Sequence, residues 1–102
     1  MRKIINKKMY DTDTAEFVEV FENTPYRSNA YYFKEKLYRK KTGEFFLHGY
    51  GNALTRYAEV TIGGMCSPGE KIIPLTEEEV KNWVEQNGDI DTYIELFGEV
   101  EE

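Results

Sequence analysis

Residues 31–48 read YYFKEKLYRKKTGEFFLH, and this stretch decides the fold class. Two runs rich in aromatic residues, 31–40 and 44–48, flank Lys41-Thr42-Gly43. Aromatic residues favour the pleated surface of a sheet, and Gly43 suits the positive φ of a short hairpin loop. We therefore predict an antiparallel hairpin here, and expect the rest of the chain to build around it.

The first strand of this hairpin has one apolar face and one face that is both basic and aromatic. Alternate residues of a strand point to opposite sides of the sheet. The face that we predict to be inward carries Tyr31, Phe33 and Leu37, and the opposite face carries Tyr32, Lys34, Lys36, Tyr38 and Lys40. Lysines interleaved with aromatic rings suit phosphates and stacked bases. The competing interpretation is a solvated face, partly covered by the acidic C-terminal half, or a surface for an acidic protein.

Turn residues and alternation place the other elements of the sheet. Further strands are predicted at 2–5, 8–10, 16–23 and 71–73. Pro74 is expected to end the last of them, and the glycine-rich residues 61–69 are expected to form a loop. Asn52 is a candidate N-cap for a short helix over 53–58.

The C-terminal part carries a strong helix signal. Thr76 with Glu79 three residues later forms a capping box, and the spacing of Val80, Trp83 and Val84 gives a buried stripe. The helix is predicted over 76–87 with Gly88 as its C′ residue, followed by a second helix over 89–97. The predicted fold is α+β in a single domain, 1–102: an antiparallel meander of four to five strands, mainly in 1–51, with C-terminal helices packed on one face.

The charge is divided unevenly along the chain. The net charge is −6, yet residues 1–56 contain 11 Lys/Arg and 7 Asp/Glu, whereas residues 57–102 contain 2 and 12. Such a division indicates either a surface for a charged partner or two parts that attract each other within one fold. The sequence leaves both interpretations open.

Several chemistries find little support in the sequence. Cys66 and His48 are the only residues of their kinds, and a structural zinc site needs about four such ligands. Gly49-x-Gly51 lacks the parallel βαβ context of a dinucleotide loop, although an anion could bind a helix starting at Asn52, near Arg56. No signal peptide or membrane span is apparent. We expect a cytoplasmic protein without enzymatic activity, cofactor or metal.

Three stretches together carry a resemblance to a known family. They are Lys8-Met9-Tyr10-Asp11-Thr12-Asp13-Thr14-Ala15, the segment from Leu37-Tyr38-Arg39 through Gly43 to Phe45-Phe46-Leu47-His48-Gly49, and Ile72-Ile73-Pro74-Leu75-Thr76-Glu77-Glu78-Glu79. With these the chain resembles a family of short proteins of phages and other mobile elements of Gram-positive bacteria. The resemblance implies no active-site residue. It implies a protein that counters host defence, and anti-CRISPR proteins belong to this kind.

The function predicted is therefore that of a binding protein that inhibits a host protein, such as a CRISPR effector or another nucleic-acid-handling defence complex. The partner would meet an acidic surface, because carboxylates can exploit the attraction that basic grooves exert on phosphates. Its residues are Glu78, Glu85, Asp89, Asp91 and Glu95. The alternative is a nucleic-acid-binding regulator that uses Tyr32, Lys34, Lys36 and Tyr38. A third hypothesis is a small enzyme acting on a nucleotide near Gly49–Arg56.

Overall fold

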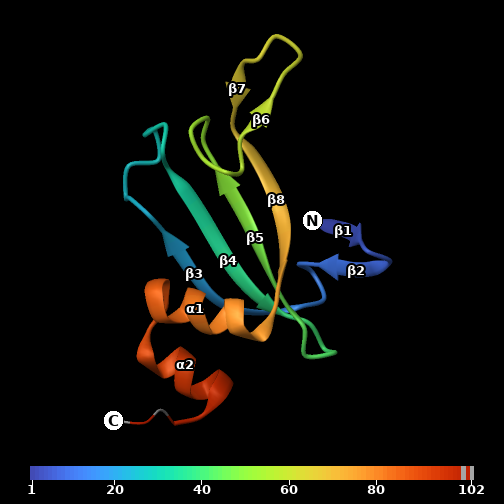
Figure 1. The fold of residues 1–102 in the computed structure, drawn as a ribbon, viewed down its shortest axis with the longest axis vertical. Coiled ribbons are helices and arrows are strands. Elements are labelled where there is room, and N and C mark those ends of the chain that lie inside the picture. The colour runs from blue at the N-terminus through green and yellow to red at the C-terminus, as the bar shows by residue number, and fades with distance from the viewer. Residues whose placement is uncertain (100, 102) are drawn as a thin grey trace.

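The computed structural model describes residues 1–99 and 101 and contains eight strands followed by two helices (Figure 1). In chain order the elements are β1 (Arg2–Ile5), β2 (Lys8–Asp11), β3 (Glu16–Glu22), β4 (Phe33–Arg39), β5 (Phe45–Gly51), β6 (Glu59–Val60), β7 (Cys66–Ser67), β8 (Gly69–Leu75), α1 (Glu77–Asn87) and α2 (Ile90–Phe97). The molecule is elongated, with β6 and β7 at one end and α2 at the other.

The central layer is a four-stranded antiparallel sheet in the order β3-β4-β5-β8. The predicted hairpin is confirmed: β4 pairs with β5 from Phe33↔Gly51 to Arg39↔Phe45. Its loop contains Gly43 at φ 92°, a conformation that an L-residue rarely adopts. The α+β prediction, with an antiparallel sheet and C-terminal helices, is therefore correct.

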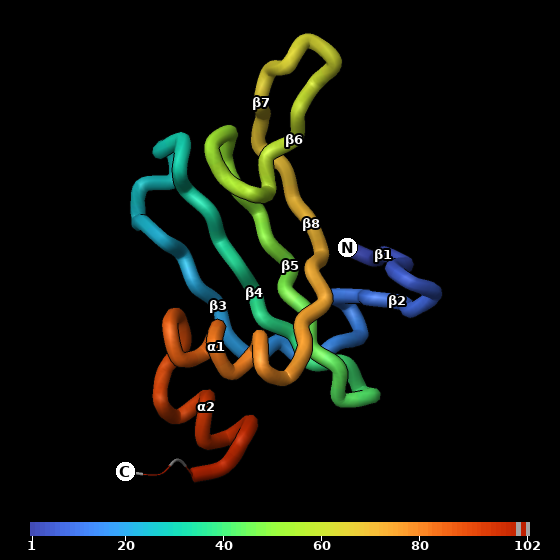
Figure 2. The backbone as a smooth tube through the Cα atoms, in the orientation of Figure 1, coloured from blue at the N-terminus to red at the C-terminus, as the bar shows by residue number. Residues whose placement is uncertain are grey.

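Three short segments differ from the expectation. Residues 59–67, expected mainly as a loop, form the small β6–β7 hairpin, which the chain enters after β5 and leaves into β8 (Figure 2). Strand β8 does not stop at Pro74 but continues to Leu75. Proline is tolerated there because β8 is an edge strand. No helix forms over 53–58; hydrogen bonds from Thr55 N–H to Asn52 and from Ala58 N–H to Thr55 make successive turns instead.

Both faces of the sheet are covered, by different elements. Helices α1 and α2 pack on one face around a core of Leu37, Leu47, Val80, Trp83 and Val84. The β1–β2 hairpin covers part of the other face around Tyr10, Tyr38, Phe46 and Ile72. The predicted packing of the capped helix through Trp83 is thus confirmed, whereas the second core was not foreseen.

Helix α1 begins as the sequence predicts. The N–H of Glu79 donates to Thr76 Oγ1 at 3.2 Å, and the N–H of Thr76 donates to Glu79 Oε1 at 2.9 Å. Gly88 ends the helix in an extended conformation, not in the left-handed conformation expected of a C′ glycine. Among the described residues, no helix is long and apolar enough to cross a membrane.

Candidate functional site

The most distinctive charged surface lies on the two helices. Five of their carboxylate side chains are exposed and take no part in a helix cap; we call this set the acidic helical face, and its members are Glu77, Glu78, Glu85, Asp91 and Glu95. Four of these residues were predicted as partner-binding from the sequence. The fifth, Glu77, precedes Glu78 in the first turn of α1.

Two neighbouring carboxylates serve the fold. Glu79 closes the capping box of α1, and the N–H of Thr92 donates to Asp89 Oδ1 at 2.8 Å at the start of α2. These backbone hydrogen bonds lower the pKa values of both carboxyl groups. Asp89, predicted as a partner-binding residue, therefore already has a structural role as the N-cap of α2.

The acidic helical face has little compensating charge. Lys81 is the only cation in 76–99, and its Nζ lies 3.7 Å from Glu77 and 3.8 Å from Glu78. Within the part of the chain that the structure describes, Glu85, Asp91 and Glu95 have no cation within 4.0 Å. Three carboxylates are thus left for interactions outside the fold.

Two of these three carboxylates occupy unfavourable positions. Glu85 lies in the last turn of α1 and Glu95 in the last turn of α2, and neither turn contains a basic residue. The helix dipole places partial negative charge at this end, so a carboxylate there costs stability. The structure itself gives no reason for acids at these positions.

The basic side chains of the sheet do not neutralise the helices. Lys34 and Lys36 pair across the sheet with Tyr50 and His48, on the face opposite to Leu37 and the helices. Among the described residues, no ion pair joins a carboxylate of 77–99 to a cation of 1–71. The carboxylates of the helices are therefore separated from the lysines of the sheet, whereas Glu70 of the acidic part lies beside His48.

The expectation of exposed tyrosines beside these lysines is wrong. Tyr38 is 9% exposed and stacks on Phe46, with ring centroids 5.3 Å apart. Tyr32 is 3% exposed, and its hydroxyl donates to Glu22 at 2.6 Å. Burial, aided at Tyr32 by Glu22, raises both phenol pKa values. The burial of Tyr38 follows from the β1–β2 hairpin and the second core. Because both rings are buried, neither is free to stack on a base.

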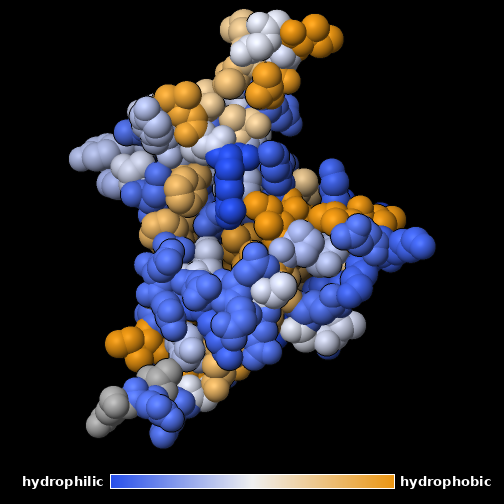
Figure 3. Space-filling model, in the orientation of Figure 1, coloured by the Kyte–Doolittle hydropathy of each residue, from blue (hydrophilic) through white to orange (hydrophobic). Residues whose placement is uncertain are grey.

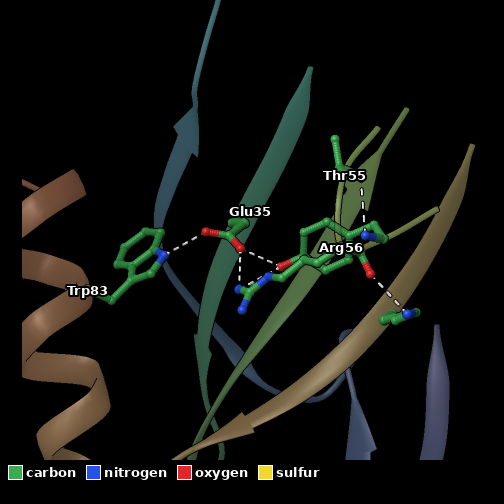
Figure 4. Close-up of polar contacts among 6 residues, drawn as sticks. Glu35, Thr55, Arg56 and Trp83 are labelled. Atoms are coloured by element: carbon green, nitrogen blue, oxygen red, sulfur yellow. Dashed lines mark hydrogen bonds and ion pairs between the residues drawn. The ribbon is translucent and has the colours of Figure 1, made fainter. Parts of the chain in front are cut away.

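A buried polar cluster centred on Glu35 was missed (Figure 4). Glu35, 4% exposed, accepts hydrogen bonds from Trp83 Nε1 at 2.9 Å, from Arg56 and from the hydroxyl of Tyr57. Burial, then the hydrogen bond to Glu35, raises the pKa of Tyr57 well above its usual range. The sequence did contain a signal for this cluster, because strand alternation puts Glu35 between Phe33 and Leu37 on the inward face.

This cluster joins three segments of the fold. Glu35 belongs to β4, Trp83 to α1, and Arg56 and Tyr57 to the turns after β5. The Tyr57 ring fits only because residue 49 is glycine: a Cβ on Gly49 would lie 1.9 Å from Tyr57 Cζ. Among the described residues, no buried side-chain polar atom lacks a hydrogen-bond partner. Because its buried polar atoms are paired within the fold, we interpret the cluster as a contact that holds β4, α1 and the turns after β5 together.

The nucleotide hypothesis loses its structural basis at the same place. It required a helix N-terminus at Asn52, but the chain turns there instead, and the Asn52 side-chain amide donates to Arg27 and Asn29 oxygens, each at 2.8 Å. Arg56 is engaged with Glu35. Gly49 and Gly51 instead make room for the side chains of Tyr57 and Thr55.

Comparisons with known proteins found no relative of this chain. No family model matches the chain, and neither a curated protein nor a solved structure matches it.

Proposed function

We propose that this chain is a non-enzymatic binding protein whose acidic helical face engages a basic surface on another protein. The observation that carries the proposal is the placement of Glu85 and Glu95 at helix C-terminal turns without a cationic partner among the described residues. Acids kept where they destabilise a helix are explained by a partner that compensates them.

The electrostatics favour fast association with a basic partner. The whole chain carries a charge of −6, and the helices that bear these carboxylates pack on the sheet face opposite to Lys34 and Lys36. Charge of one sign that is concentrated on one surface attracts an oppositely charged surface over roughly 8–10 Å at moderate ionic strength. Packed helices also fix the backbone positions of these residues, so that binding has to order their side chains but not the chain that carries them.

Nucleic-acid-handling proteins are the partner class that this surface fits. Their grooves are lined with Lys and Arg that contact phosphates, and carboxylates on a helix pair can occupy such a groove. The resemblance to proteins of phages and mobile elements makes a host defence complex of this kind the proposed partner. The proposed action is competition with nucleic acid for that groove.

A capture experiment with charge-matched variants tests the proposal. Tagged wild type is compared in a nuclease-treated Gram-positive bacterial lysate with Glu85→Lys/Glu95→Lys and with a control, Asp13→Lys/Glu59→Lys. The control acids are also exposed and have no cation within 4.0 Å among the described residues. Both variants change the net charge equally.

We expect a basic nucleic-acid-binding protein to be retained by wild type and control and to be lost with the helix variant. Added DNA or RNA should release it, and its retention should fall as salt rises. Equal retention by both variants would show that position on the helices does not matter and would contradict the proposal.

The alternative, direct nucleic-acid binding through the sheet, has weaker support. Lys34 and Lys36 are half-buried and have no ion-pair partner within the described residues. The same face also carries Glu22 and Glu70, and the tyrosines expected beside the lysines are buried. A gel shift at low salt, unchanged by Lys34→Glu/Lys36→Glu, would remove this alternative.

A further inference from the structure

A hollow at the corner between the two helices combines apolar and acidic walls. It measures about 360 Å³ and is lined by Val84, Glu85, Gly88, Asp89, Ile90, Tyr93 and Ile94. Its volume equals that of about twelve water molecules of the liquid, which gives room for one large apolar side chain. Figure 3 shows a hydrophobic patch beside hydrophilic atoms at the lower left edge, where α1 turns into α2.

The apolar residues of α2 face in two directions. Tyr93, Leu96 and Phe97 pack against the core under α1. Ile90 and Ile94, one turn apart, point elsewhere and remain 75% and 39% exposed. Apolar residues adjoining a hollow in this way are typical of contact surfaces for another molecule.

Carboxylates adjoin this apolar patch. Glu85 and Asp89 line the hollow itself, while Asp91 and Glu95 are the chain neighbours of Ile90 and Ile94. Lys81, the single cation of the helices, lies elsewhere: its Nζ is 5.2 Å from the centroid of the Phe97 ring. An apolar centre with a charged rim is the usual arrangement of a protein-binding site.

We propose that this hollow receives an apolar side chain from a partner protein segment in which Lys or Arg residues flank that side chain. The proposal rests on the proposed function and names the feature of the partner that the acidic helical face recognises. Charge complementarity selects this occupant. A second copy that met this site through its own helices would bring carboxylates against the same rim, and an anionic lipid surface would be repelled.

The two parts of the site have separable roles. The carboxylates govern the association rate and its dependence on salt, because they act over a distance. The apolar hollow governs the dissociation rate, because water must re-enter when the side chain leaves. Removing the apolar contact should therefore weaken binding without removing its salt dependence.

Synthetic peptides test this division directly. The probe is the peptide Gly-Lys-Arg-Leu-Lys-Arg-Gly, its control replaces the central Leu by Ser, and binding is followed by NMR shifts of backbone amides at low salt. We expect shifts at residues 84–95 and a Kd at least tenfold lower for the Leu peptide than for the Ser peptide. The protein variant Ile90→Ser/Ile94→Ser should bind both peptides equally weakly. Because Ile90 is mostly exposed and Ile94 only partly, the variant should stay folded with at most a small fall of its urea midpoint.

The outcomes separate this inference from the proposed function. Equal affinity of wild type for the Leu and Ser peptides would overturn the apolar contact and leave the acidic face as a purely electrostatic site. No shift with either peptide would count against both proposals. A concentration-dependent dimer abolished by Ile90→Ser/Ile94→Ser would also overturn the inference, since a second copy would then be the occupant.

Discussion

The sheet region pairs more of its acidic side chains with cations than the helix pair does. In the sheet region, five carboxylates each lie within 4.0 Å of a cationic or histidine side chain: Glu16, Glu22, Glu35, Glu44 and Glu70. On the helices, Glu85, Asp91 and Glu95 have no such neighbour among the described residues. Within the described chain, Asp13 and Glu59 outside the helices also lack such a neighbour, but only Glu85 and Glu95 combine this lack with a position in the last turn of a helix.

This difference does not follow from burial alone. Glu16 is exposed like the helical acids, yet Arg39 Nη2 lies 2.7 Å from it; the half-buried Glu44 has Lys8 Nζ at 2.8 Å. Lys81 stands four residues before Glu85, a spacing at which helix ion pairs form, but its Nζ lies near Glu77 and Glu78 instead. Glu95 has no lysine four residues away on either side. The last turns of both helices are therefore the region that stability does not explain.

The largest expected effect on stability comes from removing the buried carboxylate of the sheet. Glu35→Ala removes the common acceptor of Trp83, Arg56 and Tyr57 and leaves buried donors unpaired. We expect the free energy of unfolding to fall by about 2–4 kcal/mol in urea titrations, because the Trp83 and Tyr57 donors are buried whereas the Arg56 side chain is 56% exposed. The matched control Glu85→Ala on α1 should change it by less than about 0.5 kcal/mol. If the two variants lost similar amounts of stability, the contrast between sheet and helix carboxylates would be refuted.

A smaller effect is expected from closing the space beside the same cluster. Gly49→Ala would place a Cβ within 2 Å of the buried Tyr57 ring, so the ring or the strand must move. Overpacking of this kind costs about 1–3 kcal/mol, measurable as a lower urea midpoint. Gly63→Ala is the control, because no heavy atom lies within 4 Å of a Cβ built there. A stable Gly49→Ala protein would show that Tyr57 is not fixed as described.

The caps should matter less than the core and more than the acidic helical face. Thr76→Ala removes the acceptor for the N–H of Glu79 and should lower stability by about 1 kcal/mol. Thr76→Ser keeps the hydroxyl and should restore most of the loss. If the alanine variant unfolds at the same urea concentration as wild type, the capping box contributes nothing.

The pH dependence should reveal which carboxylates the fold uses. Hydrogen bonds from Tyr32, Lys8, Thr76 and Thr92 lower the folded-state pKa values of Glu22, Glu44, Glu79 and Asp89. A lowered pKa stabilises the folded state above the unfolded-state value, and this stability is lost as pH falls through the folded-state value. We expect a urea midpoint that is level near neutral pH and falls below about pH 4.5. A midpoint that rises on acidification would mean that relief of helical repulsion dominates.

Local signals made the hairpin and the capped helix predictable. The alternation in 31–40 and the glycine at position 43 act within a few residues, and so does the capping box of Thr76. The predicted acidic residues could likewise be found by counting charge. Their exposure and lack of partners could not, because these depend on which face of the sheet each element covers.

The missed features all depend on contacts between distant residues. The Trp83–Glu35 hydrogen bond spans 48 residues, and Tyr38 is buried only because the β1–β2 hairpin folds over it. Gly49 looked like part of a ligand loop, but its role is set by Tyr57 across the turn. The hollow at Ile90 and Ile94 needed the angle between two helices, which no local pattern supplies.

The most direct test of the central claim is urea unfolding of Glu85→Gln/Glu95→Gln at low salt. The account predicts that this variant is as stable as wild type or more stable, by up to about 1 kcal/mol, because two carboxylates leave the negative ends of helix dipoles. The increase should shrink as salt is added. A loss of stability greater than about 0.5 kcal/mol would show that these side chains serve the fold, and would contradict their assignment to a partner.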